Sequence, residues 1–228
     1  MAEKKRKQVK SKQRVADHGE VFTSEREVNA MLDLVKAETE RIESRFLEPA
    51  CGDGNFLTEI LNRKLAITKA QYRRFPPDYE KYSVLALSSL YGVELLQDNV
   101  DACRERLFKI WNKAYTSICK QDATDQCREA ARYILAHNIL CGNALDMRKS
   151  DGTPIIFAQW DFVMGNLIKR RDYRLDELVA GQQGEENGQM TIGTISSEWE
   201  YDPEVGAMMP KPIKEYPPID FRRVQEYG

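Results

Sequence analysis

Expected strands and expected helices alternate along most of this 228-residue chain. A Ser24–Glu27 capping box, followed by apolar residues at helical spacing, predicts a helix over residues 24–43. Short apolar runs predict strands over residues 45–49, 91–95, 138–141 and 160–164. Amphipathic stripes lie between these runs, so we expect an α/β fold: a mostly parallel sheet with helices on both faces, incomplete at its C-terminal strands.

Charge and composition divide the chain into three parts. Residues 1–14 carry seven Lys or Arg residues and one Glu, a charge of +6, whereas the rest of the chain carries −8. This predicts a basic, disordered arm over 1–14, which either binds a phosphate backbone or is simply a solvated tail. Residues 15–180 form the expected cofactor-binding domain. Residues 181–228 are rich in Gly and Pro and are expected to form an irregular tail, with one strand at 190–195.

Composition also excludes several classes of protein. No apolar run approaches the roughly 20 residues that cross a bilayer, and no apolar segment follows the basic start as in a secretory signal. The five cysteines contain no C-x-x-C pair, and the chain has two histidines. These counts argue against a disulfide framework and a metal site, so a soluble, cytoplasmic protein is expected.

The segment LEPACGDGNF, residues 47–56, carries the strongest chemical signal. An expected strand runs into Gly52-x-Gly54 and then into a helix, which lets the backbone turn sharply and approach a ligand. Such ligands bind at the carboxyl ends of parallel strands. Leu57 occupies the third glycine position of a dinucleotide fingerprint, which disfavours a Rossmann dehydrogenase. The alternative is a tight turn with no ligand.

Glu94 ends the expected strand YGVEL at 91–95. A carboxylate there can accept hydrogen bonds from both hydroxyls of a ribose bound over the glycine turn. An isolated acid at a strand end is more often solvated or a cap. Together with the glycine turn, however, the ribose role is the favoured interpretation.

Five motifs in a fixed order resemble a known family. They are GEVFT (19–23), EPACGDGNF (48–56), YGVEL (91–95), CGNALD (141–146) and WDFVMGN (160–166). The order is similar to that of S-adenosylmethionine-dependent DNA methyltransferases, in particular the N6-adenine enzymes of bacterial restriction–modification systems. The resemblance covers residues 15–166 and implies a Rossmann-like methyltransferase fold, S-adenosylmethionine as cofactor and DNA as partner.

The resemblance also implies a role for each matching residue. Those lining the methionine side of the cofactor would be Gly19, Phe22 and Thr23. Those forming its floor would be Glu48, Gly52, Asp53 and Gly54. Glu94 would hold the ribose, and Asn143 would lie beside the adenine ring.

The catalytic motif of that family, Asp/Asn-Pro-Pro-Tyr/Phe, is only partly present. Asn166 matches its first position and is the implied catalytic residue, accepting a hydrogen bond from the amine of a flipped-out adenine. Leu167, Ile168 and Lys169 replace Pro-Pro-Tyr, which removes a stacking contact worth about 1–3 kcal/mol. A basic cluster follows, and it either contacts phosphate or is a solvated face: Lys169, Arg170, Arg171 and Arg174.

Three functions therefore remain open. The first is an N6-adenine DNA methyltransferase or its catalytic-domain fragment. The second is a catalytically impaired module that binds cofactor and DNA and works with a partner. The third is a methyltransferase of the same fold acting on RNA or protein. Only 62 residues follow Asn166, too few for a separate target-recognition domain, so target recognition would come from a partner subunit or be absent.

Overall fold

The computed structural model describes residues 10–18, 20–182, 199–202 and 207–228. The first half contains α1 (Lys12–His18), α2 (Glu25–Leu34), α3 (Lys36–Thr39), β1 (Phe46–Glu48), α4 (Asn55–Tyr72), α5 (Pro76–Ser88), β2 (Leu90–Glu94) and α6 (Gln97–Cys119). The second half contains η1 (Lys120–Asp122), α7 (Asp125–Asn138), β3 (Ile139–Cys141), β4 (Ile156–Met164), β5 (Leu167–Arg174), α8 (Leu175–Gln182), β6 (Trp199–Asp202), β7 (Ala207–Pro210), β8 (Lys214–Glu215), β9 (Ile219–Asp220) and η3 (Phe221–Tyr227).

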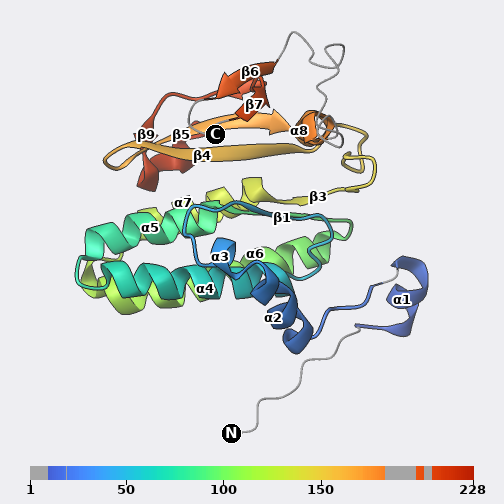
Figure 1. The fold of residues 1–228 in the computed structure, drawn as a ribbon, viewed down its shortest axis with the longest axis horizontal. Coiled ribbons are helices and arrows are strands. Elements are labelled where there is room, and N and C mark those ends of the chain that lie inside the picture. The colour runs from blue at the N-terminus through green and yellow to red at the C-terminus, as the bar shows by residue number, and fades with distance from the viewer. Residues whose placement is uncertain (1–9, 19, 183–198, 203–206) are drawn as a thin grey trace, which may run out of the picture.

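The expected α/β fold with a parallel sheet is confirmed. Strands β1, β2 and β3 pair in that order, and all are parallel. Helices α4 and α6 pack against one face of this sheet (Figure 1). None of the helices within the described ranges is long and apolar enough to cross a membrane.

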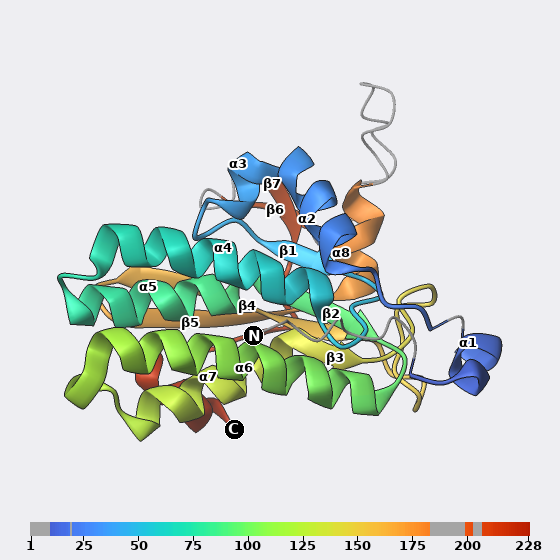
Figure 2. The ribbon, with the colours of Figure 1, turned by 90° about the horizontal axis from the view of Figure 1, so that it is seen from below.

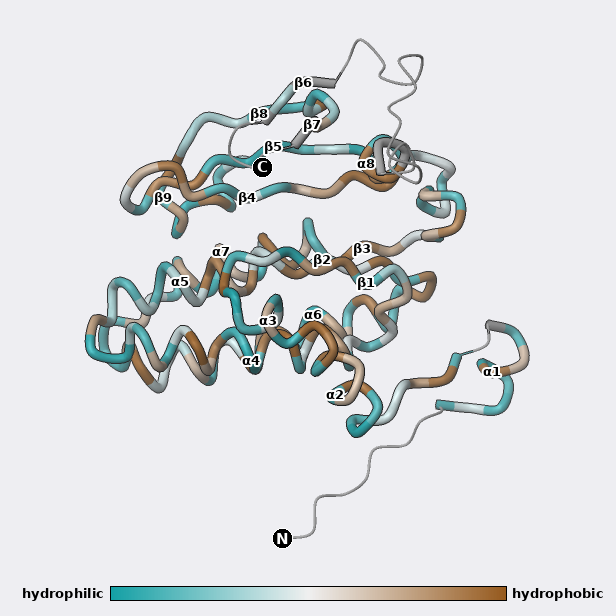
Figure 3. The backbone as a smooth tube through the Cα atoms, viewed as in Figure 1, coloured by the Kyte–Doolittle hydropathy of each residue, from teal (hydrophilic) through white to brown (hydrophobic). Residues whose placement is uncertain are grey.

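The opposite face of the parallel sheet is covered mainly by a second sheet, with Leu175 of α8 in the same buried cluster, which corrects the expectation of a helical layer on both faces. In this sheet β4 pairs with β5, and β5 also pairs with β8 and β9, all antiparallel. The Tyr91 hydroxyl donates to the Ala158 carbonyl at 3.1 Å across the two sheets. Tyr91, Val93, Ile155 and Phe157 form a buried apolar cluster there. Hydrophobic residues accordingly concentrate in β2 and β3, between the outer layers (Figure 3).

Strand β4 is not the fourth parallel strand that the alternation predicts. Gly165, with φ of +55°, and Asn166 form a two-residue turn, and the chain returns as β5. Parallel neighbours need a crossover of a dozen or more residues, usually helical, whereas such a turn produces a hairpin. Arg45, just before β1, pairs with Asp161, late in β4, at 2.6 Å. Strand β4 therefore runs opposite to β1, and its end lies near the start of β1.

The described part of the C-terminal segment is packed, which corrects the expectation of an irregular tail. Strands β8 and β9 extend the antiparallel sheet, and η3 lies against α7 (Figure 2). Phe221 and Val224 are fully buried, and Arg222 pairs with Glu80 of α5 at 2.5 Å. Alternating apolar residues are too sparse here to have signalled these short strands. The strand expected at 190–195 lies outside the described residues.

The N-terminal boundary also differs from expectation. Helix α1 begins at Lys12, so the boundary placed between residues 14 and 15 falls inside a helix. The helix expected over 24–43 ends at Leu34, and the short α3 follows it. The predicted capping box is confirmed, because Ser24 and Glu27 exchange both hydrogen bonds of that motif.

Lys64 of α4 is a basic side chain with no exposed surface. Its amino group donates to the carbonyl of Ile42 at 3.0 Å, to the hydroxyl of Ser89 at 2.7 Å and to the carbonyl of Ser44. These bonds hold the segment before β1 against the start of β2. Burial lowers the pKa of Lys64 to about 7.

This buried lysine predicts a specific dependence of stability on pH. An unfolded lysine titrates near pH 10.5, so the unfolded chain binds more protons than the folded chain above pH 7. The contribution of Lys64 to folding stability therefore rises with pH through this window. Relative to Lys64→Met, the wild-type chain should gain about 2 kcal/mol of unfolding free energy between pH 7 and 8.5 in urea titrations. If the difference in unfolding free energy between the wild type and Lys64→Met stays constant with pH, this account is contradicted.

Candidate functional site

The glycine turn lies at the carboxyl edge of the parallel sheet, directly after β1. Gly52 and Gly54 have φ of +53° and +90°, the left-handed region that favours glycine. A Cβ on Gly54 would lie 2.6 Å from Cys103 Sγ, and one on Gly52 would lie 3.1 Å from the Phe22 ring. The Cys51 amide donates to the Val93 carbonyl at 3.0 Å, which fixes the turn beside the end of β2.

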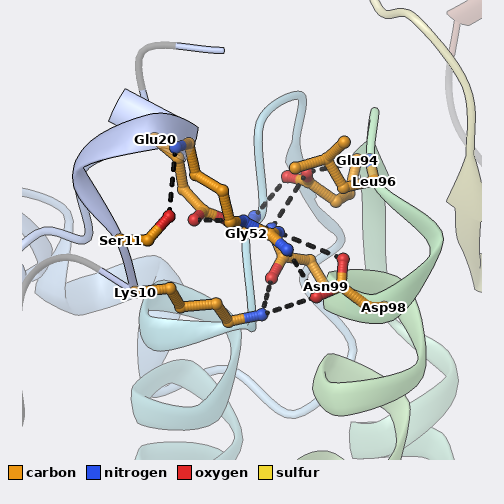
Figure 4. Close-up of polar contacts among 9 residues, drawn as sticks. Lys10, Ser11, Glu20, Gly52, Glu94, Leu96, Asp98 and Asn99 are labelled. Atoms are coloured by element: carbon orange, nitrogen blue, oxygen red, sulfur yellow. Dashed lines mark hydrogen bonds and ion pairs between the residues drawn. The ribbon is translucent and has the colours of Figure 1, made fainter. Parts of the chain in front are cut away.

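Glu94 ends β2 and faces this turn (Figure 4). Its Oε2 accepts a hydrogen bond from the Gly52 amide at 2.9 Å. Its Oε1 accepts from the Leu96 amide at 3.0 Å and from the Asn99 side chain at 3.2 Å. The structure thus brings together the two features that the sequence singles out, and it fixes the carboxylate in one orientation.

Asn99, in the first turn of α6, links Glu94 to a second acid. It is 1% exposed, and its amide also donates to Glu20 Oε1 at 2.6 Å. Neither Glu20 nor Asn99 is among the site residues predicted from the sequence. Glu20 lies inside the GEVFT motif, which is the one sequence signal that could have indicated it.

The basic arm reaches this site through α1. Arg14 forms two hydrogen bonds of 2.7 Å with Glu20, and others of 2.7 and 3.1 Å with Asp98. Lys10 pairs with Asp98 at 3.0 Å and also donates to the Asn99 side chain. Hydrogen bonds from Arg14 hold the pKa of Asp98 well below its usual range. Burial raises the pKa of Glu20, but its bonds to Arg14 and Asn99 lower it more.

The segment before α2 also lies at this edge. Phe22 is buried against the glycine turn, and the Thr23 carbonyl accepts from the Asn55 side chain at 2.9 Å. Glu48 ends β1, and burial raises the pKa of its carboxyl group. Phe22, Thr23 and Glu48 therefore lie beside the glycine turn, and their predicted contacts with a cofactor stay predictions. Gly19 lies outside the described residues.

Asp53 faces the body of the protein. Its side chain is 5% exposed and pairs with Arg106 of α6 at 2.8 Å. Arg106 also donates to the Asp53 carbonyl at 2.5 Å and to the Asn55 side chain at 3.1 Å. The Asp53 carboxylate thus fastens the glycine turn to α6, a role that the expectation of a cofactor contact did not include.

Asn143 follows β3 at the same edge of the sheet. Its side-chain oxygen accepts from the Leu145 amide at 3.0 Å, so the residue shapes its own loop. Two large apolar side chains are exposed in the loops at this edge. Leu95, directly after β2, is 56% exposed, and Leu145, in the loop after β3, is 93% exposed. The Leu95 carbonyl accepts from Cys141 Sγ at 3.5 Å, which joins these two loops.

Asn166 is not brought to this edge. It lies in the turn between β4 and β5, where its carbonyl accepts from the Phe221 amide at 3.0 Å. β4 runs from the loop that follows β3 toward the start of β1, and a strand of its length spans about 25 Å. The predicted catalytic residue and Glu94 therefore lie at opposite ends of the parallel sheet.

The basic side chains of the cluster after Asn166 form ion pairs within the chain. Its ion pairs are Lys169–Glu215 at 2.8 Å, Arg170–Asp172 at 2.6 Å, Arg171–Asp161 at 2.9 Å and Arg174–Asp176 at 2.6 Å. The side chains of Arg170 and Arg171 are buried or nearly so, which corrects the expectation of a solvated face for these two residues, whereas Lys169 and Arg174 are partly exposed. The expected phosphate contact stays a prediction. Tyr173, on the same strand, is buried.

The described residues contain no group of three or more His, Cys, Asp or Glu placed to hold a metal ion. Two surface hollows in the described part of the chain are lined by other residues, one by Arg104 and Arg132 among others and one by Tyr72 and Tyr82 among others. Neither of these two hollows is lined by Gly52 or Glu94. No protein-family model, curated protein or solved structure matches the chain.

Proposed function

We propose that this chain is a catalytically impaired, methyltransferase-like module that binds S-adenosylmethionine at the Gly52–Glu94 site. One observation carries the proposal: the Glu94 carboxylate at the end of β2 accepts a hydrogen bond from the Gly52 amide of the turn that follows β1. This arrangement places a carboxylate beside a glycine turn, whose backbone a ligand can approach closely, at the carboxyl edge of a parallel sheet. Ligands of open α/β sheets bind at that edge.

The residues present fit the cofactor. Glu94 accepts three protein hydrogen bonds, and an ionised carboxylate offers about four acceptor positions, so capacity remains for a ribose hydroxyl. Gly52 and Gly54 leave the turn without side chains, and Leu95 and Leu145 offer apolar surface for a base. When bound, the cofactor supplies an electrophilic methyl group on a sulfonium.

The position of Asn166 favours the impaired module over the N6-adenine methyltransferase. Methyl transfer requires the acceptor amine to lie in line with the cofactor methyl group. Asn166 stands at the other end of the sheet, and the residues after it form β5, in which Ile168 is fully buried. DNA methylation by this chain therefore remains a prediction from the resemblance. No observation favours RNA or protein as the methyl acceptor.

The proposal is tested by isothermal titration of S-adenosylmethionine and S-adenosylhomocysteine into the purified chain. We expect micromolar binding by the wild type and at least about tenfold weaker binding by Glu94→Gln, because hydrogen bonds to a charged group are worth about 1.5–3 kcal/mol. Glu129→Gln removes an equal charge from an exposed position on α7 and should bind like the wild type.

Two outcomes would contradict the proposal. The first is absence of binding by a folded wild-type chain. The second is equal affinity of the wild type and Glu94→Gln. Separately, methyl transfer to duplex DNA that is abolished in Asn166→Ala would favour the enzyme over the impaired module.

A further inference from the structure

The N-terminal helix is fastened to the candidate cofactor site by a continuous chain of hydrogen bonds. Arg14 donates to Glu20. Glu20 and Glu94 both accept from the Asn99 side chain, and Glu94 accepts from the Gly52 amide (Figure 4). Apart from these contacts, α1 lies at the margin of the molecule, and its residues are mostly hydrophilic (Figure 3). Polar contacts of Lys10 and Arg14 therefore hold α1 in place.

The docked arm changes the charge of the site. Three carboxylates, those of Glu20, Glu94 and Asp98, lie within this network, and Lys10 and Arg14 bring two positive charges to it. S-adenosylmethionine carries a sulfonium and an ammonium against one carboxylate, a net charge of +1. The positive charges of Lys10 and Arg14 thus offset the negative electrostatic potential of these carboxylates, which would attract a cationic cofactor.

Lys10 and Arg14 are placed so that they can exchange their carboxylate partners for phosphate groups. The side chains of Lys10 and Arg14 are 34% and 26% exposed, and their shared partner Asp98 is 54% exposed. The two ion pairs with Asp98 are exposed enough to be weak and screened by salt, whereas the Arg14–Glu20 pair, in which Glu20 is 7% exposed, must also open when Arg14 exchanges its partner. Residues 1–14 together carry +6, the composition that binds a phosphate backbone through counterion release.

We propose that α1 is an ionic latch on the cofactor site, and that the phosphate backbone of duplex DNA releases it by binding Lys10 and Arg14. DNA binding then uncovers the carboxylates of the site, so that DNA and S-adenosylmethionine bind with positive coupling. Coupling of this kind is reciprocal, so the cofactor must also tighten DNA binding by the same factor. The inference rests on the proposed cofactor site and adds its regulation and its partner.

The test measures the affinity for S-adenosylmethionine with and without a 20-base-pair duplex, for the wild type and Arg14→Gln. The variant should bind the cofactor at least about fivefold more tightly than the wild type, and DNA should add little to it. DNA should raise the wild-type affinity toward that of the variant. Lys113→Gln is the control: it removes one positive charge from the same helix as Asp98, about 22 Å away, and should behave like the wild type.

Each contrary outcome has a distinct meaning. If Arg14→Gln binds the cofactor as the wild type does, or more weakly, the latch is overturned while the cofactor site stands. If DNA leaves the wild-type affinity unchanged, the role of DNA as the releasing partner is overturned. If neither protein binds S-adenosylmethionine with or without DNA, the proposed function fails as well.

Discussion

Gly54→Ala is expected to lower the free energy of unfolding by about 2–5 kcal/mol. Two costs combine at this position. A non-glycine residue at φ of +90° is strained by about 1–2 kcal/mol. The added Cβ would also lie 2.6 Å from Cys103 Sγ, which is fully buried and cannot move aside, and overpacking of this kind costs about 1–3 kcal/mol. Urea unfolding of the wild type and the variant at pH 7 measures the sum of these two costs.

Gly152→Ala separates the two costs. Gly152 has a similar φ of +80°, but an added Cβ would meet nothing within 4 Å. Only the backbone strain remains, so a loss of about 1–2 kcal/mol is expected. Equal losses for Gly54→Ala and Gly152→Ala would show that close packing between the glycine turn and α6 does not constrain this turn.

Asp53→Ala is expected to destabilise the fold by about 2–4 kcal/mol. The substitution leaves Arg106 without the carboxylate that binds it at 2.8 Å beneath the glycine turn. Removing one partner of a buried ion pair typically costs about 3–5 kcal/mol, and the Arg106 side chain, at 28% exposure, recovers part of this from water. Chemical denaturation of the purified variant gives the value.

A double-mutant cycle assigns the effect to this pair. Arg106→Met combined with Asp53→Ala should show a coupling energy of about 1–3 kcal/mol. Asp125→Ala is the matched control, because it breaks an ion pair with Arg128 of the same 2.8 Å length in which Asp125 is 91% exposed. That variant should lose less than about 1 kcal/mol. A coupling energy near zero for Asp53 and Arg106 would contradict the structural role.

The sequence was sufficient where local patterns determine the structure. The Gly52-x-Gly54 turn can be predicted because few residues other than glycine tolerate positive φ, and the capping box at Ser24 because it depends on two residues three apart. The position of Glu94 beside Gly52 follows from the rule that parallel strands end at one edge. These predictions needed no knowledge of long-range contacts.

The sequence was insufficient where long-range pairing decides. An apolar run such as residues 160–164 predicts a strand, but its direction depends on the connection before it, and residues 142–155 contain no crossover helix that would return the chain for a parallel strand. The resemblance placed Asn166 beside the cofactor on the assumption of a parallel fourth strand. The Asp53–Arg106 pair and the Glu20–Asn99 hydrogen bond join residues far apart in sequence, and no local signal marks these pairings.

The central claim is that Glu94 holds the ribose of an adenosyl cofactor, and one comparison tests it most directly. Calorimetry would measure the affinities of S-adenosylhomocysteine and its 2′-deoxyribose analogue for the wild type and for Glu94→Gln. We expect the wild type to bind the deoxy analogue about tenfold more weakly, because one hydrogen bond to the carboxylate is lost, and the variant to discriminate much less. Equal affinity of the wild type for both compounds would contradict the claim.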